Sequence, residues 1–229
     1  MSRHFKNDLE QAYHALLAMS GEVEAMINLS VKSLMNRDLR TAGKVIESDT
    51  EIDSTEVRIE EDCLKMLALH QPVAADLRRL TTMMKINNDL ERMADLACNV
   101  AERASGVVTV GDFPIPDLIN TMAEQVVVMV RDSLNAFVNL DVDQASGVIG
   151  SDDAVDQTNV TVIDNLSNLM SNNPAWVAPA LHCFSAARHL EQIADHATSI
   201  AEDVIYMVSG EIVRHKHHAP ESVDDSGPT

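Results

Sequence analysis

The chain repeats its own pattern, and this repetition constrains its fold more than any other feature of the sequence. Residues 22–53 align without a gap onto residues 125–156, and 11 of these 32 positions are identical. Residues 89–102 align onto residues 189–202 in the same way, with seven identities in 14 positions. The offset changes from 103 to 100 residues between the two alignments, a difference that a loop can absorb. We therefore expect two tandem copies of one structural unit.

Each unit contains three segments in which apolar residues recur at helical spacing. In the first unit the expected helices cover residues 5–36, 39–69 and 73–104. Asp38 precedes the second of these helices as a candidate N-cap, and Pro72 is expected in the first turn of the third. In the second unit the expected helices cover residues 117–138 and 142–170, followed by a last helix that ends near residue 208.

The predicted fold class is therefore all-α, with two tandem, pseudo-symmetric three-helix bundles made of six long helices. The first bundle covers residues 1–104 and the second covers residues 117–210. Residues 105–116 between them contain two glycines and two prolines and are interpreted as a linker. Residues 211–229 are polar and are expected to form a flexible tail.

The charge of the chain excludes two classes of partner. With 17 basic and 36 acidic residues, the formal net charge is −19. Direct binding to nucleic acid and docking on an anionic membrane both require clustered Lys and Arg, so neither is expected. The longest apolar run, Val126–Val130, is far shorter than the roughly 20 residues of a membrane span, so membrane insertion is not expected either. The three cysteines form no disulfide framework and no signal peptide opens the chain, which indicates a cytoplasmic protein.

The repeat retains four pairs of acidic residues in which the two members lie four positions apart. Residues at this spacing share one face of a helix, where two carboxylates repel each other and weaken the helix. A cation held between pairs on facing helices would relieve the repulsion, so we expect the pairs to form metal sites. The pairs are Asp49/Asp53, Glu91/Asp95, Asp152/Asp156 and Glu191/Asp195, and Glu102 and Glu202 are further candidate ligands seven residues beyond Asp95 and Asp195.

A single pair of this kind carries little information, because a chain with 36 acidic residues contains several such pairs by chance. Glu47 and Glu51 illustrate this, since Gly150 and Ala154 occupy the equivalent positions of the second unit, and we interpret them as surface residues. The alternative for all four repeated pairs is a helical scaffold whose acids only solubilise it. If they do bind metal, oxygen ligands suit Mg, Mn, Ca or Fe better than Zn.

Catalytic motifs are missing from the sequence. Carboxylate-bridged di-iron oxidases built on four-helix bundles use Glu-x-x-His on two helices, and the chain contains no Glu-x-x-His. It also contains no glycine-rich phosphate loop, no nucleophile elbow and no HExxH. We therefore do not expect an enzyme. A helical metal-storage or metal-oxidising protein that uses the same carboxylate pairs is the alternative to a regulatory protein.

Three segments resemble the PhoU family. They are Asn88–Asp95 (NDLERMAD), His189–Ala197 (HLEQIADHA) and Gln71–Arg78 (QPVAADLR), and the closing Met207–Glu211 (MVSGE) resembles the family as well. The resemblance extends over nearly the whole chain, from about residue 5 to residue 215. It implies a fold of two three-helix bundles and a cytoplasmic regulator of phosphate uptake that restrains phosphate-starvation genes.

The resemblance also implies partners and a cofactor. A PhoU-like chain would act as an adaptor between the ATP-binding subunit of a phosphate ABC transporter and a membrane sensor histidine kinase. It would form a homodimer. Some members of the family bind a multinuclear iron or zinc cluster through acid-xxx-Asp motifs, and the four pairs named above match those motifs. The identity of the metal stays open here, with manganese and magnesium as further candidates.

Overall fold

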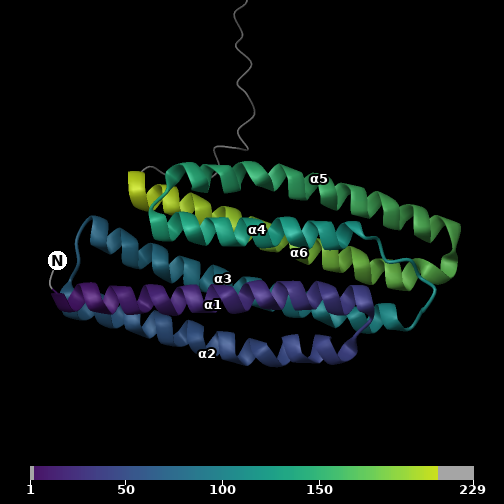
Figure 1. Ribbon diagram of the computed structural model, residues 1–229, viewed down its shortest axis with the longest axis horizontal. Coiled ribbons are helices and arrows are strands. Elements are labelled where there is room, and N and C mark those ends of the chain that lie inside the picture. Colours follow the sequence, from purple (N-terminus) through teal and green to yellow (C-terminus); the bar gives the residue numbers. More distant parts are fainter. Residues whose placement is uncertain (1–2, 211–229) are drawn as a thin grey trace, which may run out of the picture.

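The structure is a computed structural model that describes residues 3–210, and it confirms the all-α fold with six long helices (Figure 1). No strand occurs within residues 3–210. The predicted tail, residues 211–229, lies outside the described residues. The helices are α1 (Arg3–Asn36), α2 (Leu39–His70), α3 (Ala75–Val108), α4 (Leu118–Asn139), α5 (Val142–Asn172) and α6 (Val177–Ser209), and the 3₁₀ turn η1 (Pro174–Trp176) precedes α6.

The six helices form two three-helix bundles that lie side by side along their length (Figure 1). Helices α1 to α3 pack on one another, and α4 to α6 do the same. The largest contact between any two helices joins α3 to α6, and a smaller one joins α1 to α4. Helices α2 and α5 lie at opposite outer edges of the molecule. The prediction of two tandem, pseudo-symmetric bundles is therefore confirmed.

The junction between the first two helices has the same local structure in both bundles. Asp38 caps α2, because its carboxylate accepts hydrogen bonds from the backbone N–H groups of Arg40 and Thr41 at 3.0 and 3.2 Å. Its equivalent Asp141 caps α5 by accepting from the N–H of Gln144 at 3.0 Å. The residue before each aspartate has a φ of 55°, so the chain turns in the same way at both places. The N-cap prediction for Asp38 is thus confirmed.

Helix α3 differs from its predicted bounds at both ends. It continues four residues past residue 104, because Ala104 and Val107 are fully buried and extend its apolar stripe. Gly106 does not end the helix; its lack of a side chain lets the His182 ring of α6 approach, and a Cβ atom would stand 2.0 Å from that ring. At the other end α3 begins at Ala75, so Pro72 lies in the preceding turn and the prediction that it occupies the first helical turn is wrong.

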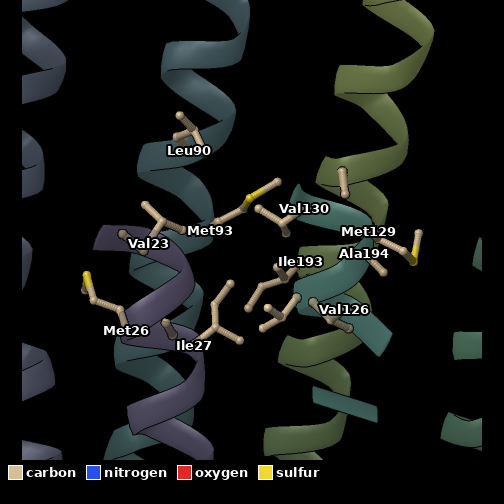
Figure 2. Packing of buried hydrophobic residues seen from close by; sticks show 14 of the residues in the cluster. Val23, Met26, Ile27, Leu90, Met93, Val126, Met129, Val130, Ile193 and Ala194 are labelled. Atoms are coloured by element: carbon tan, nitrogen blue, oxygen red, sulfur yellow. The ribbon is translucent and has the colours of Figure 1, made fainter. Parts of the chain in front are cut away.

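The hydrophobic core continues across the boundary between the bundles. Figure 2 shows side chains of α1 and α3 meeting side chains of α4 and α6, with Ile27 and Met93 on one side and Val130 and Ile193 on the other. All four are at least 98% buried. Burial of each such side chain stabilises the fold by about 1.5–3 kcal/mol. Within residues 3–210, none of the helices combines the length and the apolarity that crossing a bilayer requires.

Polar contacts accompany this core along the α3–α6 boundary. The Lys85 ammonium lies 3.2 Å from the carboxylate of Asp203, whose side chain is only 3% exposed. The Asp89 carboxylate lies 2.9 Å from His196 Nδ1. Arg78 Nε donates to the carbonyl of Met207 at 3.3 Å. A charge as buried as that of Asp203 requires a compensating group, and Lys85 supplies one from the other bundle.

We predict that Lys85→Met lowers the free energy of unfolding by about 3 kcal/mol, because the buried Asp203 carboxylate loses its ammonium partner. Lys85→Met combined with Asp203→Leu should recover most of this loss, since no charge then stays buried. Urea unfolding followed by circular dichroism measures both changes.

Lys65→Met is the matched control, because the Lys65 ammonium pairs with the exposed Glu61 and Asp62 at 3.5 and 3.1 Å. This substitution should change the free energy of unfolding by less than about 1 kcal/mol. Equal effects of Lys65→Met and Lys85→Met would contradict the proposed role of the Lys85–Asp203 pair.

Candidate metal centres

The first two acidic pairs meet between α2 and α3 and form one cluster, which we call the first acidic cluster (Asp49, Asp53, Glu91 and Asp95). Burial raises the pKa of Asp49, and the negative charges of Asp53 and Asp95 raise it further. Burial also raises the pKa of Glu91, together with the charges of Asp95 and Asp53. Carboxylates from two helices therefore lie close enough to disfavour each other's ionisation.

The other two pairs meet between α5 and α6 and form the second acidic cluster (Asp152, Asp156, Glu191 and Asp195). Asp195 stays in contact with solvent, but partial desolvation together with the charges of Glu191, Asp152 and Asp156 raises its pKa to about 6. Burial and the charge of Asp156 raise the pKa of Asp152 as well. The structure thus gathers the eight residues of the four pairs into two clusters, one of four residues on each bundle.

The two additional candidates lie further from the clusters. Glu102 is exposed and pairs with Arg103 at 3.0 Å, and its charge contributes to a raised pKa at Cys98, which lies beside the first acidic cluster. Glu202 is half-buried two turns beyond Asp195 on α6, and it is not among the strongest charges that act on the second acidic cluster. Each glutamate lies about two helical turns along its helix from the aspartate of its cluster, Asp95 or Asp195.

Sequence analysis missed one acidic neighbour of the first acidic cluster. Glu56 lies on α2 seven residues after Asp49, and its charge contributes to the raised pKa of Glu91. Its side chain accepts from Asn87 Nδ2 at 3.2 Å. The spacing along α2 places Glu56 on the same face as Asp49, but its equivalent in the second unit is Asn159. Because the second unit has no acid at this position, comparing the two units did not reveal Glu56.

One arginine pairs with the carboxylates of each cluster. In the first acidic cluster, Arg92 Nε lies 3.4 Å from Glu91 and its Nη1 lies 3.1 Å from Asp95. In the second, Arg188 Nη1 lies 2.7 Å from Glu191 Oε1. These exposed guanidinium groups offset only part of the negative charge, since each cluster contains four carboxylates.

Shielded oxygen atoms leave each cluster with capacity for a further positive group. Glu191 Oε2 is shielded from solvent and has no hydrogen-bond partner among the described residues. Asp49 Oδ1 is shielded in the same way, and hydrogen bonding by the Cys98 thiol beside this carboxylate offsets part of the rise in the pKa of Asp49. Within residues 3–210, no three carboxylate, thiol or imidazole groups converge closely enough to hold one ion. The donors fit a hard cation in chemical type, and the carboxylates must rotate toward one another before they can share it.

A thiol, that of Cys98, lies beside the first acidic cluster. Burial, followed by the charge of Asp49, raises the pKa of Cys98 to about 12, so the thiol is protonated at neutral pH. The equivalent residue of the second unit is Thr198, whose side chain lies near Asp152 and offsets part of the rise in its pKa. The eight paired residues of the two clusters all offer carboxylate oxygen ligands.

A shallow groove of about 440 Å³ runs between α3 and α6 and connects the two clusters. Asp95 lies at the edge of the first cluster and Asp195 at the edge of the second, and both line this groove. The remaining lining residues also come in equivalent pairs from the two units, namely Arg92/Gln192, Leu96/His196 and Asn99/Ser199. Equivalent faces of α3 and α6 thus line the groove, in keeping with the pseudo-symmetry of the two bundles.

We predict that the Asp195 carboxyl makes the protein less stable as the pH rises. Its pKa is higher in the folded chain than in the unfolded chain, so the folded state binds its proton more tightly. The stability that the protonated group contributes is present below the unfolded pKa of about 4 and is lost as the pH rises through the folded pKa. Asp195→Asn should therefore reduce the loss of stability between these pH values, in urea unfolding measured with EDTA present.

Asp164→Asn serves as the control for this experiment, because Asp164 is exposed on α5 outside the second acidic cluster. The variant should keep the pH dependence of the wild-type chain. If Asp195→Asn and the wild-type chain lose stability in parallel as the pH rises, the pKa of the Asp195 carboxyl is not raised in the folded protein.

Comparison with known proteins agrees with the repeated architecture. The family model of the PhoU domain matches the chain twice, over residues 16–104 and 119–204. A phosphate-specific transport system accessory protein PhoU homolog of Pseudomonas putida is 38% identical over 216 residues, which cover 94% of this chain and 84% of the relative.

Solved structures give the same result. The crystal structure of PhoU from Pseudomonas aeruginosa has a TM-score of 0.86 and 38% sequence identity, and the match covers 90% of this chain and 100% of that one. The phosphate transport system regulatory protein PhoU from Streptococcus pneumoniae matches in fold, with a TM-score of 0.85 at 24% identity over 91% of this chain and 99% of that one. With both of its units matched by the same family model, the chain belongs to the PhoU family.

Proposed function

We propose that this chain is a cytoplasmic regulator of phosphate uptake that acts by contact with other proteins. The observation that carries the proposal is the match of both units to the PhoU domain, in a chain 38% identical to a phosphate-specific transport system accessory protein. The regulator would restrain phosphate-starvation genes when phosphate is plentiful. No catalytic constellation is required for this role, because binding alone changes the state of the partner.

The proposed partners are the ATP-binding subunit of a phosphate ABC transporter and a membrane sensor histidine kinase, with this chain as the adaptor between them. The distribution of charge supports contacts of this kind. Residues 47–62 on α2 contain eight acids and one base, and residues 132–187, which include α5, contain seven acids and no Lys or Arg. Because α2 and α5 lie at the outer edges of the molecule, these acidic faces are accessible to basic partner surfaces. We also propose that the chain forms a homodimer.

The second part of the proposal is that each acidic cluster binds metal, as a multinuclear iron or zinc cluster or as manganese or magnesium. Asp49, Asp53, Glu91 and Asp95 would hold it on the first bundle, and Asp152, Asp156, Glu191 and Asp195 on the second. The raised carboxyl pKa values and the shielded oxygen atoms support this, because bound cations would neutralise charges that now repel one another. Arg92 and Arg188 would have to release their carboxylates when metal binds.

We predict that the purified wild-type protein binds Fe(II), Zn(II) or Mn(II), and that the bound metal is divided between the two acidic clusters. Asp95→Asn should remove the metal of the first cluster and Asp195→Asn that of the second, so each variant should lose about half of the bound metal. Elemental analysis after dialysis measures the loss, and the rise in melting temperature on metal addition gives an independent measure.

The matched control is Glu47→Gln, since Glu47 belongs to an acidic pair that the second unit lacks, and it should keep the full metal content. If the two aspartate variants contain as much metal as the wild-type protein, the clusters do not bind metal. The acids would then only solubilise a helical scaffold. Oxygen consumption on addition of ferrous iron would instead favour a metal-oxidising protein.

We predict that the chain restores phosphate-dependent repression in a bacterium that lacks its own PhoU-type regulator. The measurement is a reporter driven by a phosphate-starvation promoter, read at high and at low phosphate. Repression should return at high phosphate only, and the chain should bind the purified ATP-binding subunit of the transporter. Unchanged reporter activity together with no binding to either the transporter subunit or the kinase would refute the regulatory role.

A further inference from the structure

An open, largely apolar groove lies between α4 and α5, on the bundle that carries the second acidic cluster. Its volume is about 610 Å³, and Val128, Met129 and Val148 contribute apolar side chains to it. Val128 is 52% exposed although it is a large aliphatic residue. Gly147 leaves the α5 side of the groove open, because the space where its Cβ atom would stand has no other atom within 4 Å. We call this feature the α4–α5 groove.

The first bundle has different residues at the equivalent positions. Lys44 stands where the second unit has Gly147, and Glu51 stands where it has Ala154, so long polar side chains replace small ones. A glycine inside a helix is less favourable than alanine. The small residues on α5 leave space that an occupant approaching the helix closely would fill.

The groove is acidic at its rim. Glu124 and Asp132 line it from α4, and neither α5 nor the rest of residues 132–187 contains a Lys or Arg that could neutralise them. Arg131, next to Asp132 in the chain, pairs with Glu24 of α1 at 2.6 Å and also interacts with the charge of Asp132. Lys32 of α1 lines a neighbouring cavity together with Glu124, so the rim keeps only part of its negative charge. An occupant would therefore meet an apolar floor beneath negative charges.

A polar atom in the groove also lacks a partner. Gln125 Oε1 is shielded from solvent and accepts no hydrogen bond from the described residues. A buried acceptor without a donor is unfavourable, so an occupant that supplies an N–H group to it would bind more favourably. The apolar floor, the acidic rim and the unpartnered Gln125 oxygen thus all favour a cationic, amphipathic occupant.

We propose that the α4–α5 groove receives a cationic amphipathic helix of a partner protein, with apolar side chains on the floor and flanking Lys or Arg at Glu124 and Asp132. Helices commonly bind in grooves between two other helices through residues spaced three and four apart. The inference rests on the proposed function, because it identifies the surface through which a regulator acting by contact would engage its partner. It concerns α4 and α5 and requires no metal at the acidic clusters.

The direct test uses a fluorescent synthetic peptide that forms an amphipathic helix with leucines on one face and lysines flanking them. Anisotropy should report saturable binding to the wild-type protein. Gly147→Leu fills the groove with a better helix former and should weaken binding at least about tenfold. Gly43→Leu is the matched control, because Gly43 also has no atom within 4 Å of a built Cβ but lies on α2, and it should bind like the wild type.

Charge is tested separately from shape. Glu124→Gln combined with Asp132→Asn should weaken peptide binding and make it less sensitive to salt, and a peptide with glutamates in place of the lysines should not bind the wild-type protein. Circular dichroism and the metal content should stay unchanged in every variant, which shows that folding is intact. Peptide binding that is absent, or that Gly147→Leu leaves intact, overturns the inference.

The same variants separate this inference from the proposed function when they are expressed in the reporter strain. If the wild-type chain and Gly43→Leu restore repression and Gly147→Leu does not, the groove is the contact surface of the regulator. If all three restore repression, the inference fails and the regulatory role stands. If the wild-type chain fails to restore repression and binds neither the transporter subunit nor the kinase, the regulatory role fails, and the inference that rests on it fails with it.

Discussion

The contact between α3 and α6 is the interaction on which the rest of the structure depends. It is the largest helix contact in the molecule, and it joins two bundles that would otherwise share only the smaller α1–α4 contact. Its core consists of fully buried residues such as Met93 and Ile193 at equivalent positions of the two units. Because α3 and α6 occupy the centre, each also carries half of an acidic cluster, so the core contact sets the separation of the two clusters.

The acidic clusters are local departures from the rule that like charges stay apart. Burial and neighbouring carboxylates raise the pKa of Asp49 and Glu91 in the first cluster and of Asp152 and Asp195 in the second. Arg92 and Arg188 offset only part of this negative charge. A folded protein can carry such a cost because its core is large and continuous across both bundles. Charges held near one another at the expense of stability are common at functional sites, which is the physical reason to treat the clusters as more than a solvated surface.

The two bundles share one architecture but have separate surfaces. The caps formed by Asp38 and Asp141 are equivalent, and so are the acidic pairs, which shows that the framework and the clusters follow the repeat. The α4–α5 groove does not follow it, since Lys44 and Glu51 replace its small residues in the first bundle. The acidic clusters thus occur on both bundles, whereas the α4–α5 groove is a feature of the second bundle.

The sequence alone determined the helices, the repeat and the eight paired carboxylates, because helical periodicity and i,i+4 spacing are local properties that one stretch of chain specifies. The Asp38 cap could be predicted for the same reason. Only the tertiary structure decided which helix faces meet. It placed Glu56 beside the first acidic cluster, paired Lys85 with the buried Asp203, and left Val128 exposed in a groove. Those features depend on contacts between residues far apart in the chain, and spacing along a single helix carries no information about which neighbour its face will meet.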